Sequence, residues 1–249
     1  MTPPSDEAGR EFPRTSLTLH QRIHSRSSTD SAEALNEFFS RYWLPLYSFL
    51  RASGETHEDA SDFLQGFISG ELLDRDQLRA WDPEKGSMRG FLKTCLDRFR
   101  KKERRREMAL KRGGRKSETH ISIDLGWAEG YFEDQTALGD TPDRQFDREW
   151  ASAAVNQATG LLAGRYAEKG KSEEFRLLLR NLEDRGDESA SATYEVIARR
   201  LGTTPGALKQ RMRAFRAQFH QCLRQVVGEF VRDADIDEEI AFLMVALRS

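Results

Sequence analysis

Apolar residues recur along most of this chain at steps of three and four, the spacing that gathers side chains on one face of an α-helix. The first such series starts at Ala34, and Pro45 should kink its helix or start a new turn. A second helix is predicted over about 58–73. A third, long helix is predicted from Met88, after a turn at 81–87 that contains proline and glycine.

The same helical period returns after an irregular stretch. Lys111-Arg-Gly-Gly-Arg ends the third helix, and residues 118–143 are typical of an acidic linker, with a short strand predicted at 121–125. Further helices are predicted at about 146–168, 172–182, 193–201, 205–231 and 237–247. The predicted fold class is therefore all-α, with two small helical domains joined by an acidic linker.

Breaks in the pattern give the predicted domain boundaries. Residues 1–15 hold three of the seven prolines and are expected to be a disordered lead-in. The ranges that follow are a first helical domain at 16–112, the acidic linker at 113–145, a second helical domain at 146–232 and an amphipathic C-terminal helix at 233–249.

Composition narrows the class of protein. Hydrophobic residues make up 38% of the chain and charged residues 32%. No stretch approaches the roughly 18 apolar residues of a membrane helix, and the start lacks the pattern of a secretory signal. Cys95 and Cys222 lie far apart in helical patterns, which disfavours a disulfide framework and suits a reducing compartment. We therefore expect a cytoplasmic protein that does not enter a membrane.

Like charges fall in blocks, although the net charge is only −2. Eleven basic residues stand against two acidic ones over 98–116, and seven against one over 195–224. Acidic residues dominate 55–76 and 117–150 instead. A single block is most often a solvated helix face, but two basic blocks on separate helices favour a polyanion held at two places. We expect the 55–76 and 98–116 blocks to form two different interfaces.

The most specific pattern, at 193–224, predicts a helix-turn-helix. Gly202 can end the first helix, Thr204 is placed to cap the second, and Pro205 fits its first turn. The first helix is expected to bury Val196, Ile197 and Leu201. The buried side of the second helix is expected to comprise Leu208, Met212, Phe215, Phe219 and Leu223.

The other side of that second helix carries long hydrogen-bond donors: Lys209, Gln210, Arg213 and Arg216. Such side chains can reach base edges and phosphates in a major groove. An ordinary helical hairpin with solvated cations would show the same caps. The basic face near a helix N-terminus favours DNA binding.

Nine short motifs, in their order and spacing, resemble the sigma-70 family of RNA polymerase sigma factors, of the two-domain extracytoplasmic-function type and planctomycete-like. The resemblance covers about 14–247. The motifs are Arg14-Thr-Ser-Leu17, Phe38-Phe-Ser-Arg-Tyr-Trp-Leu-Pro-Leu-Tyr47, Glu58-Asp-Ala-Ser-Asp-Phe-Leu-Gln65, Trp81-Asp-Pro-Glu-Lys-Gly86, Arg89-Gly-Phe-Leu92, Lys111-Arg-Gly-Gly114, Phe146-Asp-Arg-Glu-Trp150, Tyr194-Glu-Val-Ile-Ala198 and Gly206-Ala-Leu-Lys209.

The resemblance implies a division of labour. The first domain would be region 2, which binds core polymerase and opens the promoter −10 element, and the second would be region 4, which binds the −35 element. Core binding to the clamp helices of the largest polymerase subunit would fall to Asp59, Asp62 and Gln65. Contacts at −10 would fall to Trp81, Lys85, Arg89, Arg98, Lys101, Lys102 and Arg105. Contacts at −35 would fall to Lys209, Gln210, Arg213, Arg216, Arg199 and Arg200.

The implied partners are core RNA polymerase and promoter DNA, and an anti-sigma factor is a further candidate. The chain departs from the family where an Arg-Asn pair and a later Asp commonly stand. Here the sequence has Asp97-Arg98 and Lys102, so the resemblance does not give the base preference at −10.

Enzymatic and metal-binding functions find little support. His20 and His24 have helical metal-pair spacing without a third ligand, and the 57–59 cluster fits a helix start. Acids within 124–134 lie in the linker, where no rigid element supports a magnesium site. No nucleophilic elbow, phosphate-binding glycine loop or paired cysteine ligands occur. We expect no enzyme, cofactor or metal.

Two other functions stay open. A helix-turn-helix repressor or activator would act without core polymerase and would use 34–105 only for packing. A helical adaptor with incidental basic faces would not bind DNA. The acidic face at 59–65 and the basic helix after the loop favour the sigma factor, because a simple repressor needs neither.

Overall fold

The computed structural model describes residues 22–23, 28–73, 77–110, 140–183 and 190–248. These residues are mostly helical and contain no strand, which confirms the all-α class for this part of the chain. The predicted lead-in at 1–15, the strand at 121–125 and all of the predicted 113–145 linker up to residue 139 lie outside the described residues. Two compact units are distinguished, Met1–Ser40 and Arg41–Ser249.

In the first unit, ion pairs and a side-chain hydrogen bond join the segment at 22–23 to the first turns of helix α2 (Ser28–Ala52). Arg22 lies 3.2 Å from Asp30 and 2.6 Å from Glu37, measured between side-chain nitrogen and oxygen. The hydroxyl of Ser31 donates to the carbonyl of Ile23 at 2.9 Å. The Ile23 side chain is also buried, so both polar and apolar contacts hold this segment against α2.

The second unit begins within α2, which continues through Pro45 to Ala52 as one helix. Helix α3 (His57–Gly66) follows and extends as a π-helix over Phe67–Leu73, close to the predicted 58–73. Two 3-10 turns, Gln77–Ala80 and Pro83–Lys85, precede helix α4 (Met88–Leu110).

Helices α3 and α4 approach closely where Gly66 meets Phe99. A Cβ added at Gly66 would lie 3.3 Å from the Phe99 ring. Glycine at this position lets the two helices pack without displacing the ring.

The remaining helices match the predicted ones in order and nearly in length. They are α6 (Pro142–Glu168), α7 (Ser172–Glu183), α8 (Ala190–Arg200), α9 (Pro205–Val227) and α10 (Ile236–Ala246), with a 3-10 turn at Asp233–Asp235 before α10. Helix α6 begins earlier than predicted because Thr141 accepts a hydrogen bond from the Arg144 amide at 3.3 Å, and Pro142 fits the first turn.

An aromatic cluster joins α2 to α6 and to the segment after α9. The rings of Tyr42 and Trp150 stack with centroids 4.3 Å apart, and Phe230 meets Tyr42 edge-on at 5.0 Å. Phe146 lies 5.8 Å from Trp150. Helices of both predicted domains therefore pack together within this unit, across the predicted boundary. A separate role for each domain stays a prediction.

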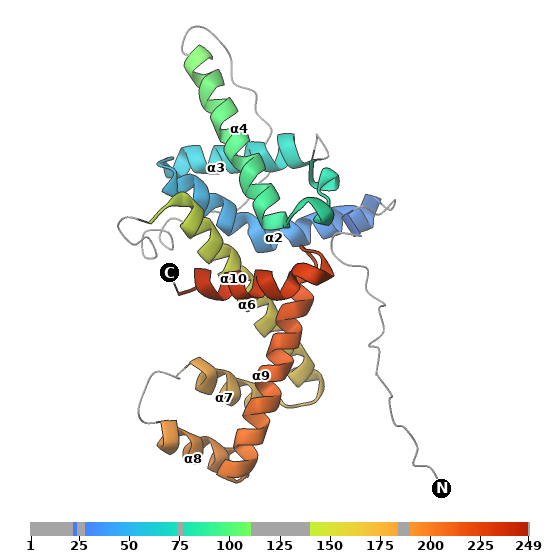
Figure 1. Ribbon diagram of the computed structural model, residues 1–249, viewed down its shortest axis with the longest axis vertical. Helices are drawn as coiled ribbons and strands as arrows, with labels where there is room; N and C mark the ends of the chain where they lie inside the picture. Colours follow the sequence, from blue (N-terminus) through green and yellow to red (C-terminus); the bar gives the residue numbers. More distant parts are fainter. Residues whose placement is uncertain (1–21, 24–27, 74–76, 111–139, 184–189, 249) are drawn as a thin grey trace. The chain divides into compact units, whose positions relative to one another are not determined.

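A second aromatic cluster holds α6, α7 and α9 together, beside α8 at the lower end of α9 in Figure 1. Tyr166, Phe175 and Phe215 form a triangle with centroids 5.8 to 5.9 Å apart. These rings are buried, so α9 is held on a rigid support along its apolar side.

Candidate nucleic-acid interface

Helices α8 and α9 form the predicted helix-turn-helix. Gly202 adopts φ 59°, a left-handed conformation that glycine reaches without a Cβ penalty, and the amide of Thr203 donates to the carbonyl of Ala198 at 2.8 Å. The hydroxyl of Thr204 accepts from the Ala207 amide at 3.2 Å, and Pro205 opens α9. Glycine, cap and proline therefore act as the sequence predicts.

The predicted buried side of α9 is largely confirmed. Leu208, Met212, Phe215 and Leu223 are buried, and Phe219 is half-buried. The apolar side of α9 packs on α6 and α8.

The prediction for α8 was wrong at Val196, which is 61% exposed. Helix α8 buries Ile197 and Ala198 instead, and Leu201 is half-buried. A helix turns about 100° per residue, so Val196 lies well round from the centre of the face formed by those residues.

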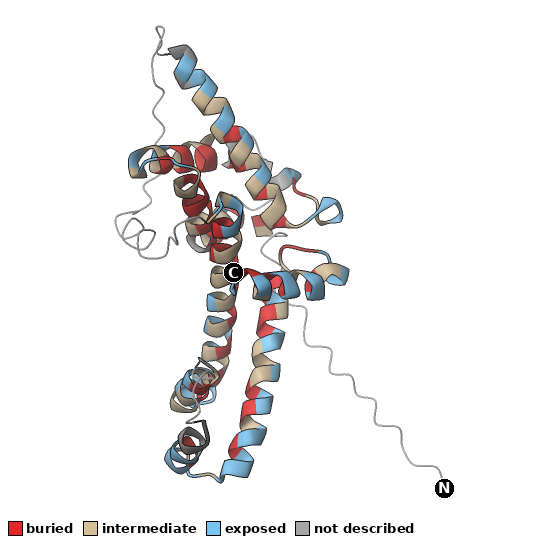
Figure 2. Cartoon of the chain, turned by 60° about the vertical axis from the view of Figure 1, so that its left-hand side comes forward, coloured by how far each residue is buried: buried red, intermediate tan, exposed pale blue. Residues whose placement is uncertain are grey.

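Three of the long donors of α9 point away from the packed side, and the fourth, Arg216, lies at its edge with its Nε buried. Lys209, Gln210 and Arg213 are exposed, and Arg216 is half-buried. Figure 2 shows exposed and buried residues alternating along this helix. Their polar groups are thus presented on one side of a supported helix, the placement that reaching into a DNA groove requires.

The two arginines that end α8 are also exposed. Arg200 pairs with Glu173 of α7 at 2.6 Å, and both side chains remain in contact with solvent. Such a surface ion pair is weak, so it leaves Arg200 able to exchange Glu173 for a phosphate.

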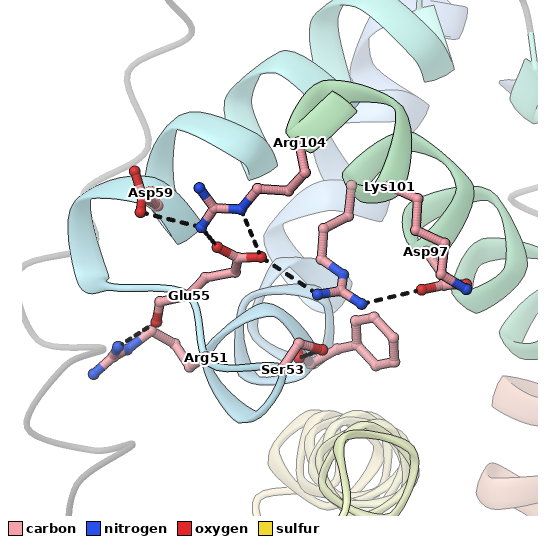
Figure 3. Close-up of polar contacts among 9 residues, drawn as sticks. Arg51, Ser53, Glu55, Asp59, Asp97, Lys101 and Arg104 are labelled. Carbon is pink, nitrogen blue, oxygen red and sulfur yellow. Dashed lines mark hydrogen bonds and ion pairs between the residues drawn. The ribbon is translucent and has the colours of Figure 1, made fainter. Parts of the chain in front are cut away.

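The basic residues of α4 divide between two sides of the helix. Arg100 and Arg104 turn toward Glu55, whose side chain is 3% exposed, and Arg104 also pairs with Asp59 at 3.3 Å (Figure 3). Arg98, Lys101 and Arg105 are exposed, and Lys102 is half-buried. The cationic surface open to a polyanion is thus the side predicted for −10 contacts.

The 55–76 and 98–116 blocks, predicted to form two different interfaces, are partly paired with each other, and their separate roles stay a prediction. Glu55 and Asp59 of the acidic block pair with Arg100 and Arg104 of the basic block. The buried carboxylate of Glu55 compensates the arginines that face it, and Arg104 also lies over the Phe63 ring at 5.1 Å. No spacing in the sequence indicates these pairs, because the partners lie 45 and 49 residues apart.

Between the two sides of α4, Asp97 links Lys101 to Arg100. Its carboxylate lies 2.5 Å from Lys101 and 3.4 Å from Arg100. Burial alone would raise the pKa of Asp97, but hydrogen bonds from the two cations outweigh it and hold that pKa below its ordinary value. Asp97 therefore stays charged and orients Lys101.

The three residues predicted to contact core polymerase lie on one side of α3. Asp62 is exposed, and Asp59 and Gln65 are half-buried. Thr56 caps this helix, with its hydroxyl accepting from the Asp59 amide at 3.1 Å. Asp62 is the carboxylate of this set that stands farthest into solvent, because Asp59 is shared with Arg104.

The predicted −10 loop keeps its tryptophan inside. Trp81 is 5% exposed, and its indole N–H donates to the carbonyl of Gly86 at 3.0 Å, which holds the loop in shape. Lys85 is 82% exposed beside Asp82. In this arrangement Lys85 can meet DNA, whereas the Trp81 ring is not presented for base stacking.

Arg89, also predicted to contact the −10 element, has a largely buried side chain. Its side chain is 13% exposed and lies 2.7 Å from Asp147 of α6 and 2.9 Å from Glu239 of α10. Burial lowers the pKa of Arg89, but hydrogen bonds and charge from Glu239 and Asp147 outweigh it and leave that pKa above the ordinary value. The guanidinium is thus permanently charged and fully engaged within the protein.

Comparisons of this chain with protein-family models, curated proteins and solved structures find no match. Within the described ranges, no group of three or more His, Cys, Asp or Glu side chains is arranged to hold a metal ion. His57, from the 57–59 cluster, instead bonds through Nδ1 to the hydroxyl of Tyr47 at 2.7 Å. No helix among the described residues is long and apolar enough to cross a membrane.

Proposed function

We propose that this protein is a cytoplasmic sigma factor of the extracytoplasmic-function type, which binds core RNA polymerase and directs promoter recognition and transcription initiation. The main support for this proposal is the arrangement of α8 and α9. The capped hairpin of α8 and α9 presents Lys209, Gln210 and Arg213 together on a helix whose other side is buried. A recognition helix needs this combination of exposed donors and rigid support.

Two further surfaces complete the assignment. The outward side of α4, with Arg98, Lys101 and Arg105, would bind the promoter near −10, where separated strands require a cationic track. The acidic side of α3 around Asp62 would dock on the clamp helices of the largest polymerase subunit. An anti-sigma factor is a candidate regulator, and the activity requires no cofactor of its own.

The direct test of the polymerase assignment is complex formation. The purified full chain is mixed with purified core RNA polymerase and passed through a gel-filtration column. We expect the chain to elute with the polymerase at stoichiometric amounts. Elution of the chain entirely at its own volume, while it still binds DNA, would overturn the assignment.

One observation favours a second function, a DNA-binding repressor or activator that acts without core polymerase. Trp81 and Arg89, both predicted for −10 contacts, are covered in this arrangement, as they would be in a domain used only for packing. Such a regulator would bind its operator tightly alone and gain nothing from core polymerase. The same column experiment, repeated with labelled DNA, distinguishes the two functions.

A further inference from the structure

Arg89 is enclosed by groups from two helices that lie far from it in sequence. Its Nε and Nη2 donate to the two carboxylate oxygens of Glu239, at 2.9 and 3.4 Å, and its Nη1 donates to Asp147 at 2.7 Å. The guanidinium also lies 3.9 Å from the centre of the Phe242 ring. The three charged side chains are each less than 15% exposed. This is a specific closed pairing and not a loose surface contact.

The neighbours of Arg89 on α4, Lys93 and Met88, are also in contact with other parts of the protein. Lys93, one turn further along α4, lies 2.9 Å from Asp143 and 3.6 Å from Asp147. Before it, the Met88 amide donates to the carbonyl of Phe230 at 3.0 Å. The start of α4 is thus covered by α6 and by the segment that leads into α10.

Close packing holds α10 in that place. A Cβ at Gly228 would lie 3.1 Å from Ile236 and 3.0 Å from the Arg224 carbonyl. The approach of α10 therefore depends on a residue without a side chain at the end of α9.

The ion pairs of Arg89 with Asp147 and Glu239 use the same donors that would bind a DNA phosphate. A guanidinium offers the same forked donors to a carboxylate and to a phosphate, so Asp147 and Glu239 occupy the positions that a DNA backbone would take. Lys101 and Arg105, farther along α4, stay exposed. At about 100° per residue, these two cations lie more than about 100° round the helix from Arg89. DNA can therefore reach them on one side of α4 while Arg89 and Lys93, on another side, are covered.

We propose that Asp147 and Glu239 form an intramolecular latch on Arg89, which keeps the start of α4 closed to DNA in the free chain and which single-stranded DNA displaces. The inference rests on the proposed function of α4 in −10 binding. The closed and open arrangements are two states of one equilibrium, and DNA favours the open one because only that state offers it Arg89 and Lys93.

The test compares three full-chain variants with the wild type. Glu239→Gln and Asp147→Asn weaken the latch. Glu238→Gln is the matched control, because it removes the same charge from an exposed neighbour on α10. Binding of a fluorescein-labelled single strand of random sequence is followed by fluorescence anisotropy. Circular dichroism establishes that each variant is folded.

We expect the two latch variants to bind the strand more tightly and the control to match the wild type. If the latch is closed in about nine molecules of ten, opening it raises the apparent affinity about tenfold. Equal gains for Glu239→Gln and Glu238→Gln would mean that net charge alone is responsible, and no gain for either latch variant would mean that no latch limits binding. Both results overturn the proposal.

A measurement on the wild type decides the question even if the variants do not fold. Met88 is the first residue of α4, so its amide has no acceptor within the helix and depends on the Phe230 carbonyl. Hydrogen exchange at this amide should accelerate when the single strand binds. Unchanged protection in the DNA complex would overturn the latch.

Failure of the latch and failure of the proposed function are separable. A double variant, Lys101→Ala with Arg105→Ala, removes two exposed cations of α4. If the single strand binds this variant as tightly as the wild type, the −10 assignment of α4 fails. If binding falls but Glu239→Gln still equals Glu238→Gln, the assignment stands and the latch is rejected.

Discussion

Glu55, just before the first turn of α3, forms an ion pair with Arg100 of α4 across 3.4 Å, with its own side chain 3% exposed. Arg104, one turn further, reaches the same carboxylate (Figure 3). This pairing fixes the rotation of α4 about its axis, because two arginines on one side are tied to α3. The side with Lys101 and Arg105 is thereby turned to solvent.

Replacing Glu55 by glutamine should destabilise the protein. The substitution removes the buried carboxylate that Arg100 and Arg104 share and leaves them only Asp97 and Asp59. We expect the free energy of unfolding to fall by about 1–3 kcal/mol. The loss stays below the roughly 3–5 kcal/mol of a fully buried pair, because water reaches both arginines. Urea unfolding measures it, with Glu168→Gln, an exposed acid at the end of α6, as the control. Equal stabilities for the two variants would contradict this role of Glu55.

Two glycine substitutions should change stability in opposite directions. At Gly228 a methyl group would meet the Arg224 carbonyl and Ile236, so Gly228→Ala should lower the free energy of unfolding by about 1 kcal/mol or more. At Gly164, inside α6, nothing lies within 4 Å of the added atom. Gly164→Ala should therefore stabilise by about 0.5–1 kcal/mol through helix propensity. Thermal unfolding of both variants checks the packing of α10 on α9, which a stabilising Gly228→Ala would refute.

The acidic side of α3 should govern affinity for core polymerase. Asp62→Lys inverts an exposed charge, and Gln65→Ala removes an amide on the same side. Both should weaken binding to core enzyme, Asp62→Lys more, while the unfolding transition stays unchanged. Glu168→Lys, on another helix, controls for the change in net charge. Surface plasmon resonance with immobilised core enzyme measures the affinities. Unaltered binding by both α3 variants would mean that this surface does not contact core polymerase.

Arg213 and Arg216 should affect DNA binding in different ways. Arg213 is exposed near the start of α9, so Arg213→Ala should cost about 1–3 kcal/mol at the preferred −35 site and blur the preference there. Arg216 lies one turn later and is half-buried. Arg216→Ala should weaken all sequences about equally and reduce the salt slope by about one. Binding to a library of altered −35 elements at two salt concentrations distinguishes these effects. The reverse pattern would mean that α9 is rotated from this orientation.

Local patterns in the sequence predict the helices and the turn of α8 and α9 well. Gly202, Thr204 and Pro205 act on their own neighbours, so their effect can be predicted without knowledge of the rest of the fold. The same reasoning misplaced Val196, because a short helix between two turns leaves its buried side defined by only a few residues.

Long-range pairing could not be predicted in this way. No pattern near Arg89 in the sequence predicts its ion pairs with Asp147 and Glu239, which lie 58 and 150 residues away. From the sequence alone, Arg89 is therefore expected to be an exposed cation, and only the tertiary structure shows that it is buried. The division of the α4 arginines depends on Glu55 in the same manner, because charge counts do not say which cations are already compensated.

The central claim is that this chain directs core polymerase to promoters, and reconstituted transcription tests it most directly. Purified core RNA polymerase is incubated with the full chain and a pool of genomic promoter fragments, and the transcripts are sequenced. The account predicts discrete start sites that require the chain, share upstream −35 and −10 sequences, and disappear with Asp62→Lys. Transcripts that are identical with and without the chain would contradict it.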